Sequence, residues 1–111
     1  MTQLTPILAA HCARACGWPR RGGDKPGRRI YWIDKNGHEV FNLSRDPDFW
    51  FPRLWTETLR AYRERDEFIA LVEGGVEFGR GDGMDFAPAK NDNYCEALCA
   101  AIEAVKGEKD A

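Results

Sequence analysis

Histidine is scarce in this sequence, with two residues in a chain of 111. Neither His11 nor His38 lies in a motif that places it beside a nucleophile or a carboxylate, and a reactive histidine needs such a partner. The glycine-rich stretch at Gly79–Gly83 lacks the spacing of a dinucleotide-binding fingerprint, and no helix is predicted to begin there. Because a nucleophile, a base and a metal set are missing as a group, we predict that the protein is not an enzyme and uses no cofactor.

Long apolar runs are also missing. No stretch approaches the ~18 residues that a membrane span requires. The first 17 residues have neither the basic start nor the unbroken apolar segment of a signal peptide. We therefore expect a cytoplasmic protein without membrane contact, in which the four cysteines stay reduced.

The chain as a whole has no large excess of charge of either sign, since its net charge is −2. That value is too small to predict a polyanionic partner. The segment Pro19–Arg29 is different, since it carries five cations and one acid and has a net charge of +4, which leaves −6 on the rest of the chain. The sequence thus predicts a basic loop in an otherwise acidic protein.

What the sequence does contain is apolar residues, at 43%, and aromatic residues, at 12%, which predict a folded chain. The length fits one domain over residues 1–111. Apolar residues that recur at three and four positions predict helices at 4–16, 47–65 and 92–106. In the central helix, Phe51, Trp55, Leu59 and Tyr62 align at helical spacing, and Pro52 is expected either to kink the helix or to begin a second one.

Two hairpins are predicted around these helices. Asn36-Gly37 is a strong two-residue turn signal, and it would place Ile33 opposite Val40. Both faces of that hairpin are apolar, so we expect other elements of the chain to pack on both of them. A second hairpin is expected at residues 67–80, turning at Gly74-Gly75, followed by a short edge strand at residues 84–87.

The predicted fold is therefore of the α+β class. We expect a three-layer α/β/α sandwich with one small antiparallel sheet of four to five strands. The first and last helices would cover one face of the sheet, and the central helix would cover the other.

The basic loop is the first candidate for binding. Its cations would hold phosphates while a tryptophan stacks on a base. In the alternative interpretation the arginines pair with acids elsewhere in the chain, and the tryptophan anchors the loop to the core. The candidate residues are Trp18, Arg20, Arg21, Lys25, Arg28 and Arg29.

The aromatic run at the start of the central helix is the second candidate. Phe49, Trp50 and Phe51 are consecutive, so they cannot all face one core. Any ring left exposed would mark a surface for a partner protein or for a homodimer. The alternative is that a kink at Pro52 lets both sides of the helix bury them.

The cysteines form two pairs with i,i+4 spacing, Cys12/Cys16 and Cys95/Cys99, on the first and last predicted helices. Four thiolates would meet at a zinc ion if these helices pack side by side. The spacing favours four small apolar core residues and no metal, because structural zinc sites take two-residue spacings from tight turns. A disulfide is the third alternative.

Several short motifs follow one another along the chain. The first predicted helix, LTPILAAHCARAC, ends in Gly17-Trp18, and a two-stranded segment follows. Next come the Trp/Leu/Pro cluster DFWFPRLWTETL at Asp48–Leu59, a strand pair, and the alanine-rich helix EALCAAIEAV. Together these motifs resemble the phage ABA-sandwich family of small phage proteins, although the long basic loop and the Phe-Trp-Phe run depart from the family pattern. The resemblance implies an α/β/α sandwich and a phage or prophage origin, and it transfers no functional residues.

These patterns together predict a non-enzymatic phage or prophage accessory protein in the cytoplasm of the host cell. We expect it to bind a host macromolecule, with a host protein as the first choice, and to fit the role of an inhibitor of a host defence system such as an anti-CRISPR. The alternative function is binding of a nucleotide or of single-stranded nucleic acid through the basic loop at residues 20–29. The sequence does not predict the oligomeric state, the choice between zinc binding and a core role for the four cysteines, or the conformations of residues 17–29 and 79–91.

Overall fold

The structure is a computed structural model that describes residues 3–23, 26–80, 83–90 and 93–110. The elements, in chain order, are α1 (Pro6–Ala15), β1 (Arg20–Arg21), β2 (Tyr31–Ile33), β3 (Glu39–Val40), α2 (Pro47–Glu64), β4 (Phe68–Val72), β5 (Gly75–Arg80), β6 (Gly83–Pro88) and α3 (Tyr94–Asp110). The predicted mixture of helices and antiparallel strands is confirmed.

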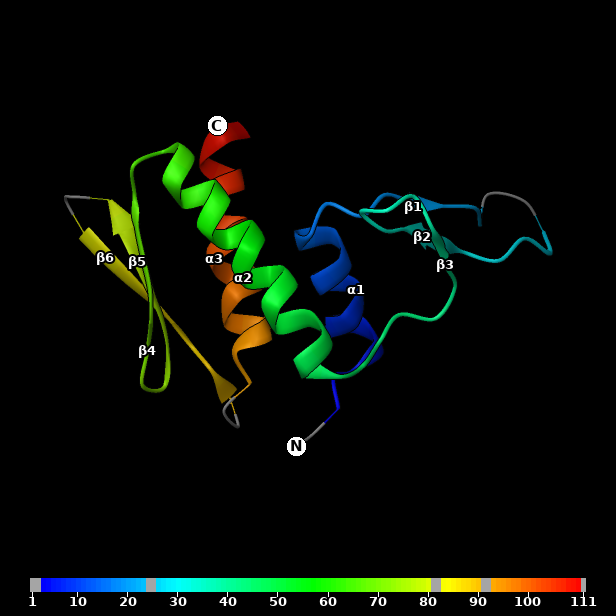
Figure 1. Cartoon of the computed structure of the whole chain (residues 1–111), viewed down its shortest axis with the longest axis horizontal. Helices are drawn as coiled ribbons and strands as arrows, with labels where there is room; N and C mark the ends of the chain where they lie inside the picture. The colour runs from blue at the N-terminus through cyan, green and yellow to red at the C-terminus, as the bar shows by residue number, and fades with distance from the viewer. Residues whose placement is uncertain (1–2, 24–25, 81–82, 91–92, 111) are drawn as a thin grey trace.

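The three helices pack on one another in the middle of the molecule, and a small sheet lies at each end (Figure 1). The sheet formed by β4, β5 and β6 packs against α2 and α3. The sheet formed by β1, β2 and β3 lies beyond α1, at the opposite end of a molecule that measures 50 × 34 × 22 Å (Figure 1). The two sheets are therefore separated by a layer of helices.

The prediction of one sheet of four to five strands with helices on both faces is not confirmed. The strands form two three-stranded antiparallel sheets, in the orders β1-β2-β3 and β4-β5-β6. Each predicted hairpin takes its third strand from the chain next to it: Arg20–Arg21 joins the first, and Gly83–Pro88 joins the second. The helices pack with each other instead of on opposite faces of a sheet, which leaves the outer face of β4–β6 without a helix (Figure 1).

The register predicted for the first hairpin is wrong by one residue. Trp32 lies opposite Val40, and Ile33 lies opposite Glu39. The cause is the Asp34 carboxylate, which accepts hydrogen bonds from two backbone N–H groups across the turn, each 2.9 Å long. Together with Gly37, whose φ is +83°, this makes a three-residue loop in place of the two-residue turn.

The second hairpin keeps the predicted alternation but turns one residue earlier than expected. Val72 pairs with Gly75, so the turn residues are Glu73 and Gly74. The predicted edge strand at residues 84–87 is confirmed as the central part of β6.

Helix α1 begins at Pro6, two residues later than predicted, because the Thr5 side chain caps it by accepting a hydrogen bond from the Leu8 N–H at 3.1 Å. Gly17, with φ of +79°, ends it. Ile7, in the first turn, is 73% exposed. Helix α3 carries the predicted buried stripe from Cys95 to Val105 but continues through residue 107 to Asp110, past the predicted end.

Helix α2 is a single helix that runs through Pro52. Its buried face is displaced from the predicted one, because the buried residues are Pro47, Trp50, Leu54, Thr58 and Tyr62. The rings predicted for that face, Phe51 and Trp55, are half-buried at its side. The indole N–H of Trp50 donates to the Ser44 carbonyl at 2.7 Å, which ties the rotation of the helix to the loop before it.

Because Leu54 has no exposed surface, Leu54→Ala is expected to lower the free energy of unfolding by about 2 to 5 kcal/mol through lost apolar burial and the cavity left behind. Ile7→Ala serves as the matched control, because that side chain is 73% exposed. We expect it to change the free energy by less than about 0.5 kcal/mol. Urea denaturation followed by circular dichroism measures both, and equal losses would contradict the described core.

Candidate functional site

Trp18, the predicted stacking residue of the basic loop, is buried in the core. It is 6% exposed, and its ring centroid lies 4.9 Å from that of Trp50 and 6.5 Å from that of Phe49. Its backbone N–H also donates to the Ala13 carbonyl at 2.9 Å. Trp18 therefore anchors the start of the loop, as the alternative interpretation predicted, and presents no free ring face to a base.

The described arginines of the loop are all at the surface. Arg20 and Arg21 form β1, and Arg28 and Arg29 lie in the segment that leads to β2. Lys25, the fifth predicted cation, lies outside the described residues. The Arg29 guanidinium lies 5.1 Å from the centre of the Phe41 ring. Among the described residues, none of these four arginines forms an ion pair with a carboxylate.

A groove of about 580 Å³ between α1 and the first sheet extends this positive surface. Arg14, Arg20 and Arg45 line it together with exposed Ile30 and Phe41. No acid is found among the described residues that line the groove. We call the six exposed arginines of this end the arginine surface: Arg14, Arg20, Arg21, Arg28, Arg29 and Arg45.

The predicted aromatic surface at the start of α2 is mostly covered. Trp50 has no exposed area, and Phe49 and Phe51 are half-buried. The Phe49 ring packs edge-on against Trp50 at 4.9 Å, and the Phe51 ring lies 6.3 Å from that of Tyr94 on α3. Of the three rings only that of Trp50 is buried, and α2 continues through Pro52 as one helix, so the burial of all three rings expected from a kink at Pro52 is not observed.

Exposed apolar side chains lie instead on the second sheet. Phe68, Met84 and Phe86 are 49%, 53% and 53% exposed. Cross-strand pairing of Phe68 with Gly79, and of Gly79 with Met84, puts them in one row, and Phe86 lies in the next row beside Glu77. The opposite side of the sheet packs on the helices through buried Val76, Phe78 and Ala87.

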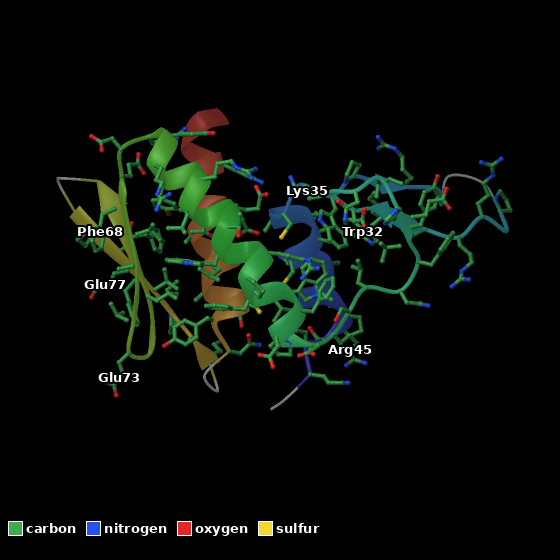
Figure 2. The ribbon with its side chains drawn as sticks, in the orientation of Figure 1. Trp32, Lys35, Arg45, Phe68, Glu73 and Glu77 are labelled. Atoms are coloured by element: carbon green, nitrogen blue, oxygen red, sulfur yellow. The ribbon has the colours of Figure 1, made fainter. Side chains whose placement is uncertain are left out.

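We call the side of this sheet that is turned away from the helices the outer face (Figure 2). The sequence contained half of the signal for it, since the alternation in β4 correctly placed Phe68, Ala70 and Val72 together. The error was to expect a covering helix there.

The four cysteines are free, buried thiols. The Sγ atoms of Cys12 and Cys99 are 3.8 Å apart, which joins α1 to α3. Hydrogen bonds with Cys95 and Cys99, and then burial, raise the pKa of the Cys12 thiol. Burial, and then the charge of Glu57, raise the pKa of Cys16 to about 12. The described residues contain no group of three or more His, Cys, Asp or Glu side chains that is placed to hold a metal ion.

Both histidines make long contacts at the surface. His11 Nδ1 lies 3.7 Å from Glu103, and His38 Nδ1 lies 3.7 Å from Asp34 in the hairpin turn. Neither contact includes a hydroxyl or thiol nucleophile.

No family model, curated protein or solved structure matches the chain. Within the described residues, no helix has both the length and the apolar character needed to cross a membrane.

The thiols are expected to be unreactive toward Ellman's reagent in the folded protein at about pH 8, because all four side chains are buried and the reagent cannot reach the sulfur atoms. All four should react after unfolding in guanidinium chloride. The absorbance of the released thionitrobenzoate counts them. Modification of native protein within the mixing time would contradict the described burial.

Proposed function

We propose that this chain is a non-enzymatic accessory protein of phage or prophage type that acts by binding a host protein through the outer face of β4–β6. The supporting observation is the exposure of Phe68, Met84 and Phe86 on one side of a sheet whose other side is packed. Three large apolar side chains in adjacent cross-strand rows form a contiguous patch, and such patches mark interaction sites on folded proteins.

The chemistry of the partner follows from what surrounds the patch. Glu77 lies in the middle strand, between Ala70 and Phe86, and Glu73 lies at the β4–β5 turn (Figure 2). An apolar centre flanked by carboxylates fits a partner that inserts apolar anchors and places lysine or arginine at the rim. A second copy of the chain is the remaining protein partner that would fit an apolar sheet face.

The biological setting in this proposal rests on the resemblance to the phage ABA-sandwich family, carried by Gly17-Trp18, Asp48–Leu59 and the alanine-rich last helix. A small binding protein of phage origin fits inhibition of a host defence system, an anti-CRISPR role included. It would meet its target in the host cytoplasm.

Affinity capture from a lysate of the host should recover a protein with wild-type chain and lose it with the double variant Phe68→Ser/Phe86→Ser, because the apolar anchors are gone. Glu77→Lys should weaken capture and make it less sensitive to salt. Quantitative mass spectrometry of the captured proteins is the measurement.

Ile7→Ser is the matched control, since Ile7 is 73% exposed on α1 and belongs to none of the proposed surfaces. It should capture as the wild type does. Equal recovery with the double variant and the wild type would exclude the outer face, and sedimentation of the purified chain separates a host partner from self-association.

A second candidate function is binding of single-stranded nucleic acid or nucleotides, and the arginine surface favours it. Its arginines lack carboxylate partners among the described residues, so their charge is available to phosphates. Phe41, close to Arg29 and 5.4 Å from the Tyr31 ring, would supply the stacking that buried Trp18 does not.

The quadruple variant Arg20→Gln/Arg21→Gln/Arg28→Gln/Arg29→Gln is expected to weaken binding of a labelled single-stranded oligonucleotide strongly at low salt. If each arginine neutralises one phosphate, the slope of log K against log salt should fall by about 2.8 in magnitude. Fluorescence anisotropy at several salt concentrations measures it. Arg60→Gln/Arg63→Gln, on α2, should change neither quantity by more than a small screening effect, and unchanged affinity in the quadruple variant would end this candidate.

A further inference from the structure

A cleft of about 800 Å³ lies between α2 and the β2–β3 hairpin and belongs to neither surface. The side chains that decide its chemistry are Trp18, Lys35, Phe49, Arg53, Glu57 and Arg60. Lys35 extends from the hairpin toward the helices (Figure 2), and its Nζ lies 3.4 Å from the Glu57 carboxylate on α2. An ion pair therefore joins the two walls of the cleft.

The floor of the cleft is apolar. It is lined by half-buried Phe49 and Val40 and by exposed Pro52, with buried Trp18 beneath them. The Cys16 thiol also lines it and is 1% exposed. Burial raises the pKa of that thiol to about 12, so it contributes an uncharged surface. A planar hydrocarbon or heteroaromatic ring would displace water from this floor at a gain in free energy.

The cations of the cleft are not equivalent. Glu57 compensates both Lys35 and Arg60, whose Nη1 lies 3.2 Å from the same carboxylate. Arg53 has no carboxylate partner among the described residues. It is held in place all the same, because Nη1 donates to the Phe49 carbonyl at 2.7 Å and the guanidinium lies 3.8 Å from the centre of the Phe49 ring.

The Arg53 guanidinium is held in place at one nitrogen and its charge is not balanced by a carboxylate among the described residues, so it can bind an anion without rearranging. Its remaining N–H groups match the oxygens of a carboxylate or a phosphate, and little side-chain entropy is lost on binding. Asn36, Asn42 and Ser44 on the hairpin wall add amide and hydroxyl groups within the same cleft. Such polar groups fix the orientation of a ligand whose body rests on the floor.

We propose that this cleft is a binding site for a small organic anion in which a planar ring is joined to a carboxylate or a phosphate. The anionic group pairs with Arg53, and the ring lies on the apolar floor beside Phe49, Pro52 and Val40. The cleft volume lies within the range of roughly 300 to 1,000 Å³ that small-molecule sites occupy. This site does not depend on the outer face or on the arginine surface, so it goes beyond the proposed function.

Titration of isotope-labelled protein with three probes tests the proposal. Adenosine monophosphate carries a ring and a phosphate, indole-3-acetate carries a ring and a carboxylate, and adenosine carries the ring alone. Binding in the cleft is detected as changes in the backbone amide chemical shifts of four residues that line it: Lys35, Asn42, Arg53 and Thr56. At least one anion should bind about tenfold or more tightly than adenosine, because only the anions engage Arg53.

Comparison of the affinities for the two anions identifies which anionic group the site prefers. Preference for the nucleotide indicates a phosphate ligand, and preference for indole-3-acetate indicates a carboxylate; either result supports the site. Absence of shifts in the cleft with all three probes at millimolar concentration would overturn it. Equal affinity for adenosine and for both anions would also overturn it, because Arg53 would then not be recognising charge.

Arg53→Gln is the decisive variant, since the amide can still donate to the Phe49 carbonyl while the charge is lost. It should weaken binding of the preferred anion about tenfold or more and leave the melting temperature unchanged. Arg63→Gln is the matched control, because Arg63 is exposed on the same helix and does not line the cleft. Arg20→Gln/Arg21→Gln should bind as the wild type does. Loss of binding in that variant, with Arg53→Gln unaffected, would assign the ligand to the arginine surface and refute the cleft.

Discussion

The packing of Trp50 is the constraint on which most of this structure depends. Its indole has no exposed area and donates to the Ser44 carbonyl at 2.7 Å, so α2 is fixed in rotation relative to the loop that precedes it. Leu54, Thr58 and Tyr62 are then directed into the core. The same rotation directs Arg53, Glu57 and Arg60 toward the β2–β3 hairpin, where they form one wall of the cleft. The position of Trp18, 4.9 Å from Trp50, follows from the same packing and sets where the basic loop begins.

Local patterns were readable from the sequence because neighbouring residues determine them. The apolar recurrence that marks the three helices, the second hairpin and its edge strand all depend on residues at most a few positions apart. The three-residue loop of the first hairpin was missed although its cause is also local. The two-residue turn was predicted from Asn36-Gly37 alone, without the Asp34 carboxylate, which accepts hydrogen bonds from two backbone N–H groups of the turn.

The partition of strands into two sheets could not be read in the same way. Both hairpins carry apolar residues on both faces, which is compatible with one covered sheet or with two sheets that are each covered on one face. The choice depends on how α1, α2 and α3 pack, and that is a non-local property. The residues that decide the cleft show the same limit, because Lys35 and Glu57 are 22 positions apart and each alone is an ordinary surface charge.

The four cysteines explain why the helices can form a layer of their own. At the contact of α1 with α3 two small buried residues meet, Cys12 on one helix and Cys99 on the other. Small side chains let two helix backbones approach closely, and the 3.8 Å separation of the Cys12 and Cys99 sulfur atoms is a packing contact of that kind. Once α1 and α3 are joined, α2 covers both, and the sheets are left at the two ends of the long axis. The arginine surface and the outer face therefore have opposite electrostatic character and no shared residues, so a ligand at one end need not displace a ligand at the other.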